Sequence, residues 1–565
     1  MKLGDARVDK LIDIIEREKR RKIVDFDINN VINYIDAANN VKKIQSYNNN
    51  IIEARRGCGK TSLIMKSLEG IEDTYVLVDC QMLRKDNQNN IVLKIANSIL
   101  NKIQEEIENE CSKKSEEYTR KYKGITGFLK KYRNEEAKKE KEEIECIISY
   151  LDYIKILKEK CKEIQNCSNE ITVQSVNSSA ASEKEYEKKE VKKSRKQEFS
   201  ENTMIALKYK KAALNLSEKL KYSKSFNSEE KTENNRSLDF VEKFSQEKII
   251  TKTEMINDLQ LDFITMFEGY KYIKDKGIML FLDDFYQIKR DSHPFILQYF
   301  HAISKNTKTG IFCYKVVTLP SSLKINYDNE VIFSVKDDYS KVELDGDLSN
   351  LEAIERSMVD MLIAMCGDET MSQNDIQGLF TADSLKYLVI ATGGIPRDFM
   401  EAFSKAIQFS RSKHKETVWK DEIYDVVRKL KEDKDSNIEI DSELSSQQVE
   451  KLLEIITNQI IKGLKTNVIL YPIELVEQHE KILKNLVNLR YLHIIKEKIT
   501  SEKTKENCRA YLVDMTFYAC GRMHANFNFC RFWEKDDHSI LNNLRRSPVW
   551  SFSDEDVKII AKYTF

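Results

Sequence analysis

The residue types that could do chemistry first gather at residues 54–62, which read Ala-Arg-Arg-Gly-Cys-Gly-Lys-Thr-Ser. Glycines let backbone N–H groups curl around a polyphosphate, and the following helix N-terminus adds the positive end of its dipole. In such a loop the lysine reaches the β- and γ-phosphates and the threonine hydroxyl binds Mg²⁺. The pattern G-x-x-x-x-G-K-[ST] is met except at its first position, where Ala54 stands. The predicted nucleotide-binding residues are Gly57, Cys58, Gly59, Lys60, Thr61 and Ser62.

Two adjacent carboxylates lie in an apolar run at residues 277–285, which we expect to form a buried strand. Mg²⁺ takes oxygen ligands and usually keeps several waters, and Asp283 at the strand end can hold one of those waters. The predicted metal ligands are therefore Thr61 and Asp283. Asp284 is placed to orient or deprotonate an attacking water. The alternative for this pair is an acidic cap on a strand end, and the phosphate loop earlier in the chain favours the magnesium site.

Two further polar residues follow in the order that such a site needs. The run 310–318 predicts a strand, and its last residue, Thr318, could contact the γ-phosphate or the attacking water. The stretch Gly-Gly-Ile-Pro-Arg at 393–397 predicts a turn that opens a helix. A guanidinium at Arg397 would couple nucleotide state to lid position. The predicted catalytic residues are Asp284, Thr318 and Arg397, against the alternatives of an ordinary strand-end threonine and a surface arginine.

The elements that must position these side chains belong to an α/β core with a parallel sheet. Short apolar or β-branched runs predict its strands, and a strand–helix–strand order at this spacing indicates a βαβ unit. The predicted strands lie at 51–52, 74–80, 277–285, 310–318 and within 331–344. We expect the core to comprise residues 1–103 and 275–350.

Residues 104–274 are predicted to be an insert between the second and third strands of this core. Apolar residues recur there at helical spacing in a Lys/Glu-rich background, which indicates a long helical hairpin or coiled coil. Residues 168–200 are polar and poor in large apolar residues, so we predict a disordered tip there. A simple spacer and an arm that binds a protein partner both remain open.

The remainder of the chain is predicted to form a helical lid at 351–432 and a C-terminal domain at 443–565. Three helical segments, the third over residues 482–492, precede two predicted strands at 493–499 and 509–513. Three helices followed by a hairpin is the outline of a winged helix, a relative of the helix-turn-helix.

The C-terminal domain carries a local positive charge. Residues 481–530 hold nine Lys/Arg against four Asp/Glu, a net charge of +5. Basic side chains neutralise DNA phosphates, so duplex DNA is a predicted partner. The residues expected to face it are Lys484 and Arg490 on the third helix, with Lys503, Lys505 and Arg509 in the wing. A protein-binding winged helix is the alternative.

Composition sets outer limits on function. The 565 residues carry 92 Lys+Arg and 92 Asp+Glu, so overall charge gives no argument for nucleic acid. No apolar run of about 18 residues predicts a membrane span, and the start of the chain lacks an apolar signal-peptide core. Eleven scattered cysteines without the spacing of a disulfide scaffold favour a reducing compartment. We therefore predict a cytoplasmic location and no membrane partner.

Taken in chain order, these motifs resemble those of AAA+ ATPases of the origin-recognition and replication-initiator branch. The chain is also similar to the related signal-transduction ATPases of the STAND class. The resemblance covers about residues 25–105 and 275–430. The motifs that carry it are the phosphate loop Gly57–Thr61, Val78-Asp79-Cys80, Asp283-Asp284, Thr318 and Gly-Gly-Ile-Pro-Arg at 393–397.

This resemblance implies a P-loop NTPase core of AAA+ type, with ATP and Mg²⁺ as cofactors and a winged helix after the lid. In that family the Gly-Gly-x-Pro-Arg arginine is the second nucleotide sensor, which matches Arg397. Asp284 stands where the initiator branch commonly has Glu, and a carboxylate shorter by one methylene implies slow hydrolysis. The long insert is foreign to the usual core.

Three functions follow as hypotheses. The first is a slowly hydrolysing ATP-dependent switch that couples nucleotide state to assembly on DNA or with like subunits. The second is a bacterial signal-transduction or anti-phage defence ATPase whose helical insert senses or recruits a protein. The third is a nucleotide-binding scaffold without useful turnover.

Overall fold

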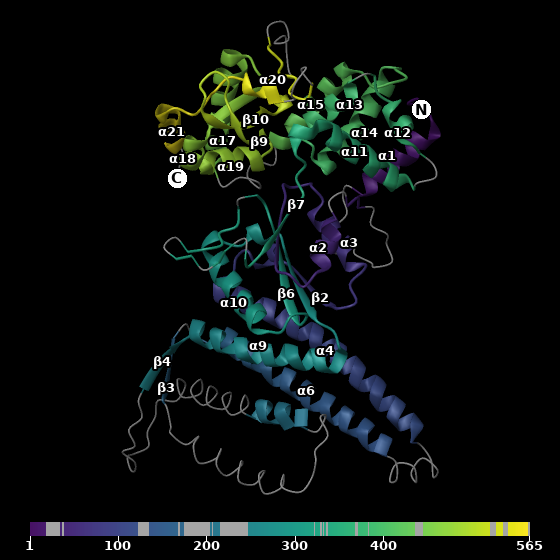
Figure 1. Cartoon of the computed structure of the whole chain (residues 1–565), viewed down its shortest axis with the longest axis vertical. Coiled ribbons are helices and arrows are strands. Elements are labelled where there is room, and N and C mark those ends of the chain that lie inside the picture. Colours follow the sequence, from purple (N-terminus) through teal and green to yellow (C-terminus); the bar gives the residue numbers. More distant parts are fainter. Residues whose placement is uncertain are drawn as a thin grey trace, which may run out of the picture.

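A computed structural model of the chain gives the architecture of most of its length. Figure 1 shows a β-sheet in the middle of an elongated molecule, long helices at one end, and a second helical body at the other. The residues that the structure describes are 1–18, 34–36, 39–122, 135–167, 170–174, 204–205, 207–214, 247–320, 322–327, 330–331, 333–334, 337–367, 371–381, 383–435, 444–519, 527–534 and 541–562.

The central sheet is parallel and five-stranded. Its strands are β1 (Asn50–Glu53), β2 (Thr74–Asp79), β5 (Ile278–Asp283), β6 (Phe312–Thr318) and β7 (Ser340–Glu343). Their order is β2-β5-β6-β1-β7, so β6 lies between the strand before the phosphate loop and the strand that carries Asp283. Asp283 pairs with Asp79, and Thr318 pairs with Glu53, so these strand ends share one edge of the sheet. The five predicted strands are confirmed, although the last covers only a short part of 331–344.

Helices cover both faces of the sheet because its strands are buried on both sides, as parallel strands usually are. Along β5, Met279 and Phe281 pack toward one pair of helices, whereas Leu280 and Leu282 pack toward the opposite set. The first pair is α2 (Asn40–Gln45) and α3 (Lys60–Leu68). The opposite set is α4 (Gln88–Lys121), α9 (Lys252–Lys274) and α10 (His293–Asn306).

The long helices α4 and α6 (Glu135–Asn166) lie antiparallel beneath the sheet (Figure 1). Lys121 of α4 contacts Glu140 of α6 at 2.6 Å, and near the other end Lys158 of α6 donates to Gln104 of α4 at 3.0 Å. The predicted helices of the insert are therefore present. Helix α4 runs without a break across residue 104, where the predicted insert begins, and the assignment as a coiled-coil insert stays a prediction.

The predicted disordered tip is wrong over part of its length. Residues Glu170–Gln174 form β3, which pairs antiparallel with β4 (Glu247–Thr251). Ladder bonds to a strand more than seventy residues away are invisible to local composition. The rest of the predicted tip lies outside the described residues.

The second body begins with the helices of the predicted lid. They are α11 (Leu351–Cys366), α12 (Gln373–Gln377), α13 (Ser384–Ala391), α14 (Pro396–Ser412) and α15 (Lys420–Asp435). Helix α1 (Ala6–Glu18) packs against α11 and α14, although the predicted core begins at residue 1. These helices share one apolar cluster with the C-terminal domain.

From α17 to β10, the C-terminal domain has the order helix–strand–helix–helix–strand–strand, and two short helices follow. Its elements are α17 (Ser446–Ile455), the π-helical η6 (Ile456–Leu464), β8 (Val468–Pro472), α18 (Ile473–Gln478), α19 (Glu480–Asn488), β9 (Leu492–Thr500), β10 (Asn507–Val513), α20 (Leu541–Arg545) and α21 (Asp554–Ala561). The three strands form an antiparallel sheet in the order β8-β10-β9.

Two sequence expectations for this domain are corrected. Strand β8 was not predicted, because a five-residue run directly before a helix gives too little periodicity to indicate a strand. Helix α19 ends at Asn488 rather than 492, since Arg490 takes a left-handed φ of 63° that stops a helix and β9 begins at Leu492.

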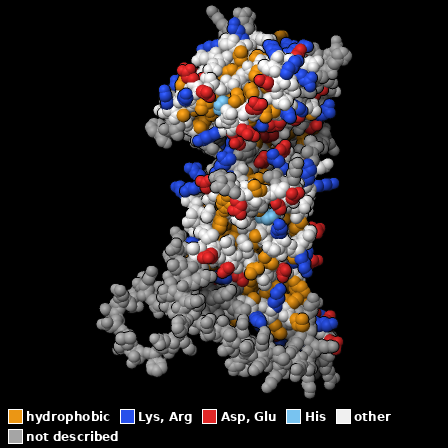
Figure 2. Space-filling view, turned by 60° about the vertical axis from the view of Figure 1, so that its left-hand side comes forward, with side chains coloured by type: hydrophobic (Ala, Val, Ile, Leu, Met, Phe, Trp, Pro, Cys, Tyr) orange, Lys and Arg blue, Asp and Glu red, His pale blue; other side chains and the backbone are white. Residues whose placement is uncertain are grey.

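The surface drawn in Figure 2 mixes charges of both signs. Lys/Arg and Asp/Glu side chains are interspersed over the upper body and the waist, with hydrophobic side chains showing between them. Within the described part of the chain, no helix combines the length and the apolar character needed to cross a bilayer.

Candidate functional site

The phosphate loop joins β1 to α3 at the carboxyl edge of the sheet. Gly57 and Gly59 adopt φ values of 86° and 84°, which side chains with a Cβ rarely tolerate. A Cβ at Gly57 would lie only 2.9 Å from Ile395 Cγ2, so the close approach of the turn before α14 also requires glycine. Lys60, the first residue of α3, is buried and donates its Nζ to the carbonyl oxygen of Ala54 at 2.9 Å. The lysine therefore points into the loop.

Thr61 and Asp283 meet at this edge, as the sequence predicted for a magnesium site. The Thr61 hydroxyl donates to Asp283 Oδ2 at 3.3 Å, and the Asp283 side chain is buried. Burial, together with repulsion from the Asp284 carboxylate, raises the pKa of Asp283 to about 6. Such a carboxylate gains from a cation, because a positive charge beside it would favour the ionised form.

Asp284 has an unusual backbone at the end of β5. Its φ of 49° lies in the left-handed region, where a non-glycine residue is uncommon and where functional residues often sit. Its N–H donates to Asp283 Oδ1 at 2.9 Å. Burial raises the pKa of Asp284, and the nearby positive charges of Lys60 and Arg56 oppose that shift. The predicted water-activating carboxylate thus lies beside the predicted metal ligand.

Thr318 ends β6 between these two groups. Its side chain is fully buried, and its hydroxyl has no hydrogen-bond partner among the residues that the structure describes. A buried polar atom without a partner is rare in proteins and calls for an explanation. A polar ligand at the sheet edge would supply the missing partner.

Arg397 lies over the phosphate loop, at the second position of α14. Its backbone N–H donates to the carbonyl oxygen of Gly57 at 3.1 Å, and its side chain is 44% exposed. A Cβ at Gly57 would lie 3.1 Å from Arg397 Cβ. The structure therefore brings this arginine to the loop, as expected for a residue that reports on bound phosphate.

The group that fits this arrangement is a nucleotide polyphosphate with Mg²⁺. The loop offers backbone donors and a buried ammonium at Lys60, while the strand ends offer a hydroxyl and two carboxylates with raised pKa values. The unpartnered Thr318 hydroxyl and the narrow cradle at Gly57 point to the same conclusion.

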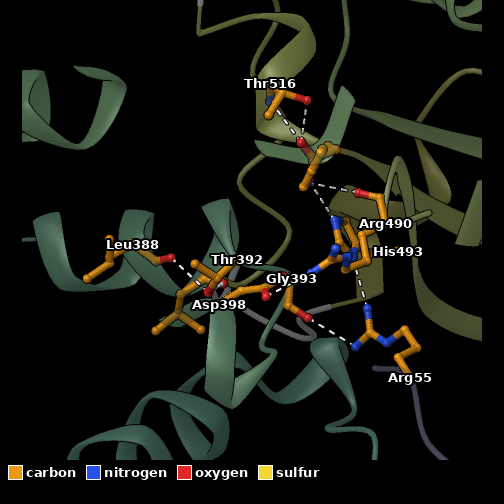
Figure 3. A network of polar contacts seen from close by, with 11 residues as sticks. Arg55, Leu388, Thr392, Gly393, Asp398, Arg490, His493 and Thr516 are labelled. Carbon is orange, nitrogen blue, oxygen red and sulfur yellow. Dashed lines mark hydrogen bonds and ion pairs between the residues drawn. The ribbon is translucent and has the colours of Figure 1, made fainter. Parts of the chain in front are cut away.

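Sequence reasoning missed a second set of residues, drawn in Figure 3. Arg55 of the phosphate loop is only 5% exposed, and its guanidinium contacts Asp345 at 3.2 Å, His493 Nδ1 at 2.9 Å and the carbonyl oxygen of Gly393 at 3.1 Å. These partners come from the end of β7, from β9 and from the turn before α14. No local signal marks Arg55, which occupies a variable position of the loop pattern.

The network continues into the C-terminal domain. His493 Nε2 lies 2.9 Å from Asp514 Oδ2, and Lys434 donates to the same oxygen at 2.6 Å. Burial lowers the pKa of His493 to about 4, and Lys434 and His493 hold the pKa of Asp514 well below its usual range despite burial. The ring is therefore neutral: Nδ1 accepts from Arg55, which has no acceptor to offer, and Nε2 donates to Asp514.

The expected DNA contacts of the third helix are wrong in this arrangement. Lys484 and Arg490 are each only 8% exposed, and Arg490 forms an ion pair with Asp398 of α14 at 2.6 Å. A cleft of about 210 Å³ separates α19 from Pro320, which follows β6. Lys484 lines this cleft and Arg490 pairs with α14, so neither side chain lies on the outer surface. Arg509 is half-buried and pairs with Glu497, whereas Lys503 and Lys505 are exposed.

Comparison with known proteins gives only weak structural similarity. No protein-family model and no curated protein matches the chain. The solved structures that are similar include Cdc6p from Pyrobaculum aerophilum (11% identity, 49% of this chain and 72% of that chain, TM-score 0.21) and two proteins of Aeropyrum pernix. These are the Orc2 protein with ADPNP and ADP (12%, 48% and 67%, 0.25) and the Orc1 protein in complex with DNA (12%, 47% and 72%, 0.22). The assignment as a P-loop α/β core rests on the sheet order and the loop geometry above.

Proposed function

We propose that this protein binds Mg-ATP at residues 57–62 and hydrolyses it slowly, as a nucleotide-dependent switch of the AAA+ type. The observation that carries the proposal is the contact of the Thr61 hydroxyl with Asp283 beside the buried Lys60. A hydroxyl, a carboxylate and an ammonium converge there on one edge of a parallel sheet. That is the donor set that a magnesium-bound triphosphate needs.

Each residue then has a defined task. Backbone N–H groups from Gly57 to Ser62 bind phosphate oxygens, and Lys60 binds the β- and γ-phosphates. Thr61 and Asp283 would hold the metal, Thr61 through its hydroxyl and Asp283 through a water. The Mg²⁺ ion supplies charge neutralisation on the phosphates. Asp284 orients the attacking water, and the unpartnered hydroxyl of Thr318 binds that water or the γ-phosphate.

Residues 351–432 would act as the lid of this site. Arg397 is the residue that reads the γ-phosphate, because its backbone already contacts the loop and, within the described residues, its half-exposed side chain is held only by an ion pair with Asp398 at 3.9 Å. An arginine that binds phosphate oxygens in two places adds geometry as well as charge. Movement of α14 would then follow nucleotide state.

An Asp284→Asn variant tests the hydrolytic role. Asn keeps the shape but cannot take a proton or orient water as a carboxylate does, so we expect hydrolysis to fall about 100-fold with ATP binding retained. Phosphate release and calorimetric binding of ATP would be measured on the same preparations. Asp79→Asn, at the end of the neighbouring strand, is the matched control. Unchanged turnover in Asp284→Asn would assign the water to another group.

The C-terminal domain is proposed to be a winged helix that binds duplex DNA. The helix–strand–helix–helix–strand–strand order and the sheet order β8-β10-β9 support this assignment. Because α19 is covered, the exposed contacts are Lys503 and Lys505 in the turn between β9 and β10. Assembly with like subunits on DNA would complete the switch.

Replacing Lys503 and Lys505 together with Ala is expected to weaken duplex binding. Each lysine that neutralises a phosphate steepens the dependence of affinity on salt, so the slope of log K against log salt should fall by about 2. Fluorescence anisotropy between about 50 and 200 mM salt would measure it. The control is Lys462→Ala with Lys465→Ala, two exposed lysines of the same domain. If both double variants bind DNA with the wild-type affinity and salt dependence, the DNA contact lies elsewhere.

The alternative function is a signal-transduction or anti-phage defence ATPase that recruits a protein through residues 104–274. It is favoured by large apolar side chains exposed on two helices of this segment, since Leu261 of α9 is 72% exposed and Ile148 of α6 is 44% exposed. The test is to delete the part of residues 104–274 that does not pack against the sheet. Under this alternative the deletion would abolish partner recruitment, and ATP hydrolysis would be retained. Under the DNA-linked switch the same deletion would leave duplex binding intact.

A further inference from the structure

Arg55 ties the phosphate loop to three separate parts of the molecule. Besides its side-chain contacts with Asp345, Gly393 and His493, its backbone N–H donates to Asp345 Oδ1 at 3.0 Å. The guanidinium is buried, and its planar fork contacts Asp345, Gly393 and His493 at once. Figure 3 shows the contacts with Gly393 and His493. A single loop residue thus contacts all three parts.

The turn before α14 is shaped to receive the His493 ring. Gly393 has a φ of 58°, and a Cβ there would lie 2.2 Å from His493 Nδ1. Any larger residue would expel the imidazole. The glycine that the sequence assigns to a turn therefore also leaves room for a side chain from β9, a hundred residues later in the chain.

The orientation of the His493 ring is fixed by Asp514, which contacts Nε2. Asp514 is fully buried, accepts from the ring, and also takes hydrogen bonds from the Thr516 backbone and from Lys434. The imidazole therefore presents Nδ1 to Arg55 in one tautomer and one orientation. A rigid acceptor of this kind transmits a displacement of the C-terminal domain directly to Arg55.

The backbone of Arg55 completes the connection to the candidate nucleotide site. Its carbonyl oxygen accepts from Lys60 Nζ at 3.3 Å, next to the Ala54 carbonyl at 2.9 Å. Anchoring of the Arg55 side chain thus holds the peptide that shapes the loop around Lys60. A loop that is fixed before binding loses less freedom on binding, and its affinity is higher.

We propose that Arg55 and His493 are positioning residues that link nucleotide affinity at the phosphate loop to docking of the C-terminal domain. The inference rests on the proposed nucleotide binding at residues 57–62. Because binding free energies are reciprocal, a His493 contact that tightens nucleotide binding is itself tightened by nucleotide. The C-terminal domain is then part of the nucleotide switch through a contact outside the phosphate-binding residues.

A double-mutant cycle tests the link. Arg55→Ala, His493→Ala and the double variant would be titrated with Mg²⁺ and AMP-PNP by calorimetry. We expect each single variant to bind about 5- to 10-fold more weakly, and the double variant to bind no more weakly than Arg55→Ala. Lys415→Gln is the matched control, because it breaks an ion pair with the buried Glu422 among the helices before the C-terminal domain and touches neither the loop nor the docking contact. That variant should lose thermal stability and keep its affinity.

Hydrogen exchange gives a second readout that a purely structural role would not move. In the wild type, Mg-AMP-PNP should slow amide exchange across β9, and in Arg55→Ala it should not. Wild-type affinity in His493→Ala, or an equal loss in Lys415→Gln, would overturn the inference while nucleotide binding stands. Failure of the wild type to bind Mg-AMP-PNP would overturn the proposed function, and the inference with it.

Discussion

A Lys60→Ala variant is expected to lose Mg-ATP binding and to hydrolyse ATP at least about 100-fold more slowly than the wild type. Lys60 is the buried cation of the phosphate loop, and its Nζ is held by the loop carbonyls at 2.9 and 3.3 Å. Hydrogen bonds from a charged group are worth about 1.5–3 kcal/mol each, and one lysine makes several to a polyphosphate. Phosphate release with and without duplex DNA would be measured.

The control for this experiment is Lys66→Ala, a partly exposed lysine in the last turn of the same helix. It should bind and hydrolyse ATP like the wild type. A thermal-shift titration separates binding from folding, because ligand stabilises only a protein that binds it. Melting temperature should rise with Mg-ATP in wild type and Lys66→Ala, and stay constant in Lys60→Ala. The DNA-linked switch is supported if Lys60→Ala loses ATP turnover and duplex DNA stimulates turnover in the wild type. Turnover that persists in Lys60→Ala contradicts the proposed site.

Acid is expected to lower the free energy of unfolding of the body formed by the predicted lid and the C-terminal domain. His493 alone should account for about 3 kcal/mol between neutral pH and about pH 4. The pKa of this buried ring is lowered from 6.5 to about 4. Between those values the unfolded chain binds a proton that the folded chain refuses, so stability falls as pH falls. Asp514, whose pKa is held well below its usual range, adds stability that is lost only below about pH 4.

Other groups titrate in the same window and must be separated. His293 of α10 also has its pKa lowered to about 4 by burial, with the same sign, whereas the raised pKa of Asp283 acts in the opposite direction. The contribution of His493 is the difference between wild type and His493→Gln in how the free energy of unfolding changes with pH. Urea unfolding followed by tryptophan fluorescence suits the purpose, because the three tryptophans, at 419, 533 and 550, lie in the lid and the C-terminal domain. Equal pH slopes in wild type and His493→Gln would show that the ring titrates normally.

The elements of the candidate nucleotide site were predictable because their signals are local. A loop that cradles phosphate needs glycine, lysine and threonine at fixed spacing, and strands buried on both faces need continuous apolar runs. Both can be read within about ten residues. For the same reason Asp283, Asp284 and Thr318 were placed at strand ends, and parallel pairing brought those ends to one edge.

Strand β3 and strand β8 show where local reading fails. Each is a five-residue segment whose strand character depends on a partner far away in the chain, β4 in one case and β10 in the other. Short runs without an extended period indicate neither helix nor strand. Only tertiary pairing decides them.

The sequence by itself determined the phosphate loop, the strand-end carboxylates and the arginine after the Gly-Pro turn, because the chemistry requires those types at those spacings. The tertiary structure alone decided which residues join the domains. Arg55 meets His493 across 438 positions of sequence, and Gly393 is small because that ring lies against it. Docking likewise covered Lys484 and Arg490, which composition had marked as a DNA face. Contacts of this range follow from how whole domains pack, and residue type or spacing carries no trace of them.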